Sequence, residues 1–145
     1  MDNIINGTEF ILSYGTAGSE VALAFSTSAS LSFGMDTRDI SNKSSAGWRE
    51  LLEAQRNWSV STEGLMAFQD AASAPVVGFA DLFTEIVART QFSVVIKTST
   101  TPVAGDYYWS GLVYLSSLEL TAPLEDNSTW TASFEGTGVL TQTTV

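Results

Sequence analysis

One stretch of the sequence separates two groups of strand-like segments: NKSSAGWRELLEAQRNW, residues 42–58. It contains three of the six basic residues of the chain (Lys43, Arg49 and Arg56) and two of its four tryptophans (Trp48 and Trp58). Connections between strands are usually short. A long, basic and aromatic connection in an acidic protein therefore indicates a segment with a role of its own.

Apolar and polar residues alternate on both sides of this stretch, which is typical of half-buried strands. Residues 129–136 show it best, with Trp130, Ala132 and Phe134 on one face. Trp58 and Val60 are predicted to point inward in the same way. The predicted strands cover residues 8–14, 20–26, 28–35, 57–65, 91–98, 107–121, 129–136 and 139–143. Residues 36–40 are compatible with either an extension of the third strand or the start of the long connection.

One long helix is predicted over residues 75–89. Proline suits the first turn of a helix and serine suits its cap, as in Ser73-Ala74-Pro75. The apolar stripe of this helix would comprise Val76, Phe79, Leu82, Phe83, Ile86 and Val87. A turn or two of helix is also expected over residues 47–54. Within residues 107–121, we expect Leu112, Tyr114, Leu118 and Leu120 to share one face.

These elements predict a mainly β fold: a β-sandwich or partly open barrel with one α-helix packed against it. The 145 residues are expected to form a single domain, 1–145. Six basic and 16 acidic side chains give a formal charge of −10, which argues against a protein that grips nucleic acid. The chain has no cysteine and no histidine, so disulfides, thiolate or histidine metal sites and Ser-His catalysis are excluded.

Candidate chemical sites are weak. Glu63 and Glu135 lie on predicted polar strand faces and could form a glycosidase pair, but such faces carry glutamates routinely. Residues 125–127 offer too few oxygens for Ca²⁺ and are predicted to be a solvated turn. We therefore expect no catalytic residue, no metal and no cofactor. The start of the chain lacks the pattern of a signal peptide, and no membrane anchor is expected.

From its residues alone, the 42–58 stretch has two interpretations. It is either a loop that folds back over the sheet, with Trp48 and Leu51 added to the core, or an assembly surface, since Trp and Arg are enriched in interface cores.

Several segments together resemble a known family. The strongest runs from Asp39 to Leu51 and contains N-K-S-x-x-G-W-R-E-L; Trp58-Ser59-Val60-Ser61, the helix and residues 117–138 follow in order. In this order and spacing the chain is similar to the major tail (tail-tube) proteins of long-tailed bacteriophages, of the lactococcal siphophage type. The resemblance covers nearly the whole chain and is weakest over residues 68–75.

The resemblance implies a structural protein of the virion tail, made in the host bacterial cytoplasm. Its hexameric rings would stack into a hollow tube that conducts DNA during ejection without binding it specifically. Partners would be further copies and other tail proteins such as the tape measure and terminator. Residues 38–57 would form a long assembly loop, with inter-subunit contacts from Lys43, Trp48, Arg49, Leu51 and Arg56. The polar faces would line the lumen through Ser59, Ser61, Glu63, Thr131, Ser133 and Glu135, although these faces are equally compatible with an outer surface.

Two alternatives stay open from the sequence: a capsid decoration or head-completion protein built as a β-sandwich, and a carbohydrate-binding module.

Overall fold

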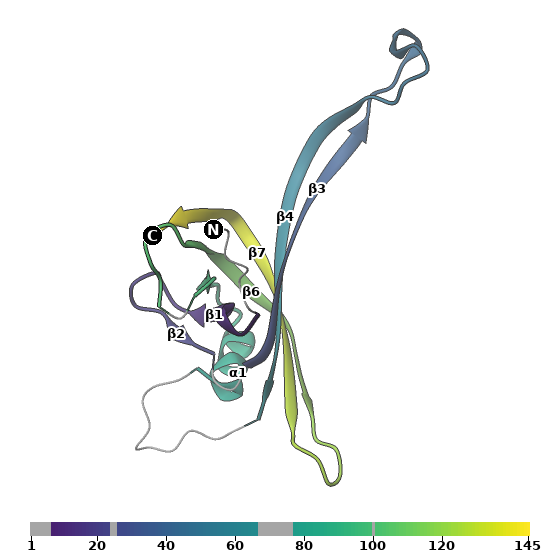
Figure 1. The fold of residues 1–145 in the computed structure, drawn as a ribbon. Helices are drawn as coiled ribbons and strands as arrows, with labels where there is room; N and C mark the ends of the chain where they lie inside the picture. Colours follow the sequence, from purple (N-terminus) through teal and green to yellow (C-terminus); the bar gives the residue numbers. More distant parts are fainter. Residues whose placement is uncertain (1–6, 24–25, 67–76, 100) are drawn as a thin grey trace.

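The computed structural model of the chain describes residues 7–23, 26–66, 77–99 and 101–145, and Figure 1 shows their arrangement. The elements, in chain order, are η1 (Gly7–Glu9), β1 (Ile11–Tyr14), β2 (Val21–Ala22), β3 (Ser26–Asp39), η2 (Lys43–Ser45), β4 (Leu51–Leu65), α1 (Phe79–Ala88), β5 (Phe92–Lys97), β6 (Tyr107–Thr121) and β7 (Thr129–Thr144). The prediction of a mainly β fold with one helix is confirmed.

The strands form one antiparallel sheet in the order β2-β1-β5-β6-β7-β4-β3. Its two end strands, β2 and β3, are not paired with each other, so the sheet is not closed. This corresponds to the partly open form of the predicted architecture. Helix α1 packs against β6.

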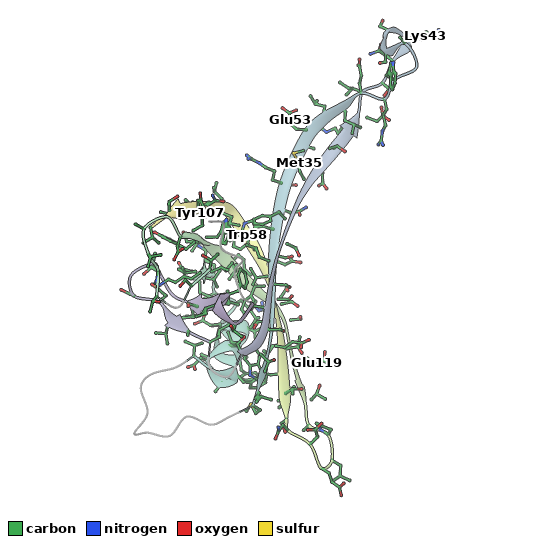
Figure 2. The ribbon with its side chains drawn as sticks, in the orientation of Figure 1. Met35, Lys43, Glu53, Trp58, Tyr107 and Glu119 are labelled. Carbon is green, nitrogen blue, oxygen red and sulfur yellow. The ribbon has the colours of Figure 1, made fainter. Side chains whose placement is uncertain are left out.

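Strands β3 and β4 continue far beyond the rest of the sheet. Only residues 59–65 of β4 pair with β7, whereas its remaining residues pair with β3 alone. We call residues 34–57 the arm; it projects from the body as a two-stranded ribbon, and Figure 2 shows Lys43 at its far end. Within the expected long loop over residues 38–57, residues 38–39 and 51–57 are strand, and residues 40–50 form a tip loop. The helical turn expected over residues 47–54 is wrong, because β4 begins at Leu51.

The predicted core faces of β4 and β7 are confirmed. Their apolar residues are at most 8% exposed: Trp58, Val60, Trp130, Ala132 and Phe134. Two glycines make room for the indoles. A Cβ on Gly136 would lie 2.0 Å from Cε2 of Trp58, and one on Gly64 would lie 2.6 Å from Cε2 of Trp130. Each tryptophan thus packs directly on the backbone of a neighbouring strand.

The predicted shared face of β6 is wrong. Tyr114 lies opposite Glu135 on the polar side of the sheet, and Leu112 shares its side. Leu118 and Leu120 lie opposite the buried Ala132 and Trp130 on the core side, although Leu120 itself is 46% exposed. The register between β6 and β7 shifts between Leu115 and Ser117. One extra residue in a strand moves every later side chain to the other face, and no alternation pattern reveals that residue.

Helix α1 is shorter than predicted. It begins at Phe79, after Gly78 in extended conformation, and the Asp81 carboxylate accepts a hydrogen bond from the Gly78 N–H at 2.9 Å. The predicted first residues of this helix, 75 and 76, lie outside the described residues. Leu82 is fully buried in the predicted stripe, but Phe83 is 55% exposed.

Tyr14 connects β1 to the helix. Its ring stacks on Phe92 with centroids 5.0 Å apart, and its hydroxyl donates to Oε1 of Glu85 at 2.8 Å. Burial, followed by the hydrogen bond and negative charge of Glu85, raises the pKa of Tyr14 to about 12. On the neighbouring strand, Lys97 forms an ion pair with Glu20, whose side chain is only 10% exposed.

Tyr14→Phe is expected to make the free energy of unfolding depend less steeply on pH in the alkaline range. The folded-state pKa of Tyr14 lies above its ordinary value near 10, so its contribution is complete below about pH 10 and is lost as the pH rises towards 12. The free energy of unfolding, measured by urea denaturation from pH 8 to 12, should therefore fall less steeply in Tyr14→Phe. The exposed Tyr107→Phe serves as the control, and equal slopes in all three proteins would contradict the expectation.

Candidate functional site

The predicted polar faces of β4 and β7 form one surface. The register places Ser59 opposite Glu135, Ser61 opposite Ser133, and Glu63 opposite Thr131. All six side chains point away from the buried Trp58 and Trp130 because neighbouring residues of a strand point to opposite sides. We call these six residues the polar face. It continues onto β3 through Ser28, Ser30 and Ser32, and onto β6 through Glu119.

This surface has hydroxyls and carboxylates but no cation. A hydrogen bond of 2.6 Å joins Ser30 and Ser61 across β3 and β4. Glu63 and Glu135 are separated by four residues in register, about 13 Å along the strands. Glycosidase carboxylates are about 5–9.5 Å apart, so this pair does not fit that chemistry. The described part of the chain also holds no cluster of three or more potential metal ligands.

The tip loop is held by its own short side chains. Asn42 accepts a hydrogen bond from the Ser44 N–H at 2.8 Å, and its own N–H donates to the Ser45 hydroxyl at 3.1 Å. Ser41 accepts from the Glu50 N–H at 2.8 Å and closes the loop across the arm. Ala46 and Gly47 then both adopt left-handed backbone conformations, with φ of 50° and 85°. The polar residues of the quoted stretch therefore fix a defined turn.

This turn presents Trp48 to solvent. Its side chain is 80% exposed, and Leu51 is 47% exposed. The interpretation of the stretch as a loop folded back over the sheet is wrong, since the arm points away from the body (Figure 1). Lys43, Trp48 and Arg49 lie in the tip loop and Leu51 is the first residue of β4 beside it, whereas Arg56 lies near the base of the arm, opposite Met35.

Arg49 has a partner within the arm. Its Nε lies 3.4 Å from the Asp39 carboxylate, and both side chains are more than half exposed. Hydrogen bonding from Ser41 lowers the pKa of Asp39, and the Arg49 guanidinium lowers it further. In the isolated chain this pair is exposed and contributes little to stability.

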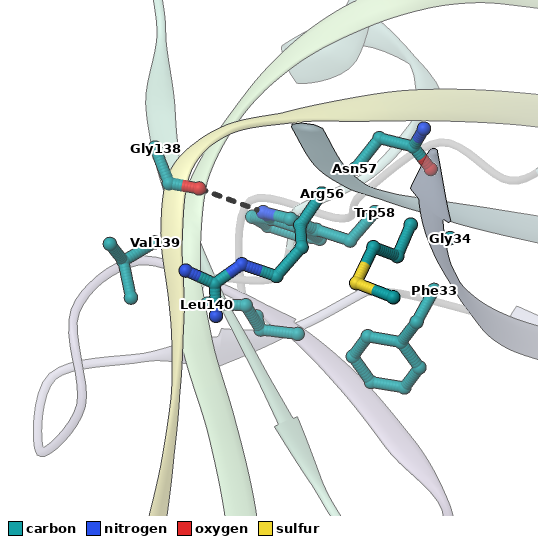
Figure 3. A pocket seen from close by; sticks show the side chains of 9 residues that line it. Phe33, Gly34, Arg56, Asn57, Trp58, Gly138, Val139 and Leu140 are labelled. Atoms are coloured by element: carbon teal, nitrogen blue, oxygen red, sulfur yellow. Dashed lines mark hydrogen bonds between the residues drawn. The ribbon is translucent and has the colours of Figure 1, made fainter. Parts of the chain in front are cut away.

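A cleft that the sequence did not predict lies at the base of the arm (Figure 3). It has a volume of about 640 Å³. We call it the fork, lined mainly by Phe33, Met35, Arg56, Trp58, Val139 and Leu140. Between the pairs Leu112–Thr137 and Ser110–Thr141, β6 has one residue and β7 has three. This bulge bends β7 away from the arm (Figure 1), and the Trp58 Nε1–H donates to the Gly138 carbonyl at 3.2 Å.

Several strand edges are open in the described part of the chain, and two of them border the polar face. β3 is an end strand, and β5 pairs with β6 only as far as Val113, so residues 114–121 of β6 have a strand on one side alone. Monomeric proteins normally protect such edges. Open edges, an exposed tryptophan on a projecting arm and the lack of a catalytic constellation among the described residues define a class of protein: a β-rich assembly subunit.

The family model described as "Phage tail tube protein" matches residues 4–142. The chain therefore belongs to the phage tail tube protein family, which is a family of structural subunits and not of enzymes. No curated protein sequence is significantly similar to the chain. The lactococcal subgroup stays a prediction.

Solved structures share the fold. One is the tail of an empty gene transfer agent particle, refined with sixfold symmetry. Its chain superposes with a TM-score of 0.74 at 20% identity, and the match covers 95% of this chain and 98% of that chain. The SPP1 tail tube superposes with a TM-score of 0.74 at 14% identity, and the match covers 98% of this chain and 80% of that chain. A chain of the anti-feeding prophage baseplate superposes with a TM-score of 0.70 at 12% identity, and the match covers 100% of this chain and 99% of that chain.

The family match supports the tail-tube interpretation over a capsid decoration protein or a carbohydrate-binding module. Among the described residues, no helix has the length and apolar character needed to span a membrane.

Proposed function

We propose that six copies of this chain form a ring and that the rings stack into the tube through which DNA leaves the virion. The observation that carries this proposal is the four-stranded surface of β6, β7, β4 and β3, which is polar on one side and has open strand edges at both ends. Edge-to-edge pairing of β3 with residues 114–121 of β6 in the next copy would continue the sheet around a ring. The sixfold symmetry of the gene transfer agent tail supports this number of copies.

The polar face is proposed to line the lumen. Six copies would carry 6 × (−10) = −60 formal charges. The face itself has Glu63 and Glu135 among small hydroxyls and no Lys or Arg to hold phosphate. Because like charges repel and phosphate binding needs clustered cations, DNA would slide past such a wall.

The arm is proposed to join one ring to the next. Lys43, Trp48 and Arg49 at the tip, Leu51 beside it and Arg56 at the base are the proposed inter-subunit contacts. Support comes from the 80% exposure of Trp48 on a well-ordered turn and from the excess of carboxylates elsewhere on the chain. The tape measure and terminator proteins are proposed as further partners, and the host bacterial cytoplasm as the place of synthesis.

Labelled tubes test this function. The chain has no cysteine, so Ser61→Cys and the exposed Val87→Cys of α1 each give one site for a heavy-atom cluster. We expect electron microscopy of the purified protein to show sixfold tubes, with the Ser61 label in the bore and the Val87 label outside. Label density in the opposite places would refute the lumen assignment, and purified protein that forms no rings or tubes would refute the function.

A further inference from the structure

We propose that the turn between β6 and β7 of one copy inserts into the fork of a second copy stacked on it. This inference rests on the proposed function, because it names the contact by which successive rings meet end to end. The inserting part consists of residues 122–128, with Leu124 at its centre. The receiving part is the cleft between the base of the arm and the bent end of β7.

The fork is an uncovered continuation of the core. The apolar face of β3 begins with Ala29 and Leu31, which pack on the core, and continues with Phe33 and Met35, which are 63% and 54% exposed. On the β7 side of the cleft, Leu140 faces Phe33 (Figure 3), and Val139 beside it is 83% exposed. Contiguous exposed apolar side chains of this kind mark an interaction site on a soluble protein.

The β6–β7 turn has the complementary shape. Leu124 is 92% exposed, more than any other large apolar residue in the described ranges. Pro123 restricts the backbone on one side of it, and Glu125 has a left-handed conformation with φ of 65° on the other. A non-glycine residue rarely adopts this conformation. The turn therefore holds an apolar side chain out in water on a defined backbone.

The charges of the two parts match. Arg56 lines the fork (Figure 3), and within the described residues it has no ion-pair partner. Glu125 and Asp126 follow Leu124, are both exposed, and form no ion pair within the same described part of the chain. Insertion of Leu124 among Phe33, Met35 and Leu140, beside Val139, would bring these carboxylates to the guanidinium at the rim, which favours the correct orientation.

The two parts lie at opposite ends of the molecule. The fork lies at the base of the arm, and the β6–β7 turn lies at the end of the sheet opposite to the arm (Figure 1). A chain therefore cannot fill its own fork. A contact between two different surfaces repeats without limit when the copies are related by translation along an axis, which is the symmetry that a growing tube needs.

Disulfide trapping tests the contact. In Leu124→Cys/Val139→Cys, a bond can form only between copies, because the two sites of one chain are far apart. We expect oxidised tubes to give a ladder of linked chains on a denaturing, non-reducing gel, and tubes mixed from the two single variants to give dimers only. Leu124→Cys/Val87→Cys is the matched control, in which both sites are exposed, Val87 lies on α1 away from the arm, and no ladder is expected.

The outcomes separate the inference from the function. Tubes that form normally without a Leu124–Val139 ladder would overturn the inference and leave the tube function standing, as would a ladder in the Val87 control alone. Wild-type protein that forms no tubes would overturn the function itself.

Charge reversal gives a second test that needs no cysteine. Arg56→Glu alone is expected to abolish tube growth, and Arg56→Glu/Glu125→Arg to restore it. Arg89→Glu, at the far end of α1, is the control and should assemble normally. Circular dichroism must show that each variant is folded. Loss of growth in Arg56→Glu that Glu125→Arg does not restore would count against the proposed pairing.

Discussion

Trp130→Ala is expected to lower the free energy of unfolding by about 3–5 kcal/mol, the range typical of a buried tryptophan. Trp130 is 1% exposed and packs on the backbone of Gly64 on the neighbouring strand. Its Nε1–H also donates to the Leu65 carbonyl at 3.1 Å. A domain of this size is stable by about 5–15 kcal/mol, so the variant should be close to unfolding at 37 °C.

The close contact between the Trp130 indole and Gly64 gives this prediction a second, specific test. In the wild-type protein, Gly64→Ala places a Cβ 2.6 Å from the indole and should cost about 1–3 kcal/mol through overpacking. In the Trp130→Ala background the indole is absent, so the same change should cost little. A double-mutant cycle in urea, followed by circular dichroism, measures the coupling. Equal costs of Gly64→Ala in both backgrounds would show that the indole and the glycine are not packed as described.

The strands of the body could be predicted because one face of each strand is buried and the other is exposed. β4 and β7 are covered on one side and open on the other, so their apolar residues alternate over many positions, as with Trp58 and Val60. The members of the polar face followed from the same alternation, and the register places them together. Which side of this surface faces the bore depends on neighbouring copies and is not encoded in one chain's pattern.

The arm and the fork could not be predicted for different reasons. In the arm, Leu51 and Leu52 have the spacing of a helix with Trp48, but β4 is set there by pairing with Asp39 and Arg38 across the hairpin. A period of three or four over so short a run does not separate strand from helix. The fork depends on the extra residues in β7 around Gly138. Gly138 has a φ of 73°, and its position within the strand was the only sequence signal for a bulge.

Trp48→Ala is expected to abolish tube growth and to leave a folded protein. Trp48 is 80% exposed, so the isolated chain loses little packing and its free energy of unfolding should change by less than about 0.5 kcal/mol. At an interface, loss of an anchoring tryptophan typically costs about 2 kcal/mol or more. Each ring of six copies would lose this amount at every arm, and about 1.4 kcal/mol already lowers an association constant tenfold. Ring stacking should therefore fail at concentrations at which the wild type assembles.

The assembly measurement needs a control that removes an exposed aromatic residue elsewhere. Phe83 on α1 is 55% exposed and lies off the arm, so Phe83→Ala should give tubes of wild-type length by electron microscopy and light scattering. Tubes of normal length from Trp48→Ala would refute the role of Trp48 as an anchor. If Phe83→Ala and Trp48→Ala shorten the tubes equally, the loss reflects general surface hydrophobicity. A deficit confined to Trp48→Ala, in a protein with unchanged thermal unfolding, would place the contact at the ordered turn that Asn42, Ser45 and Gly47 build at the tip of the arm.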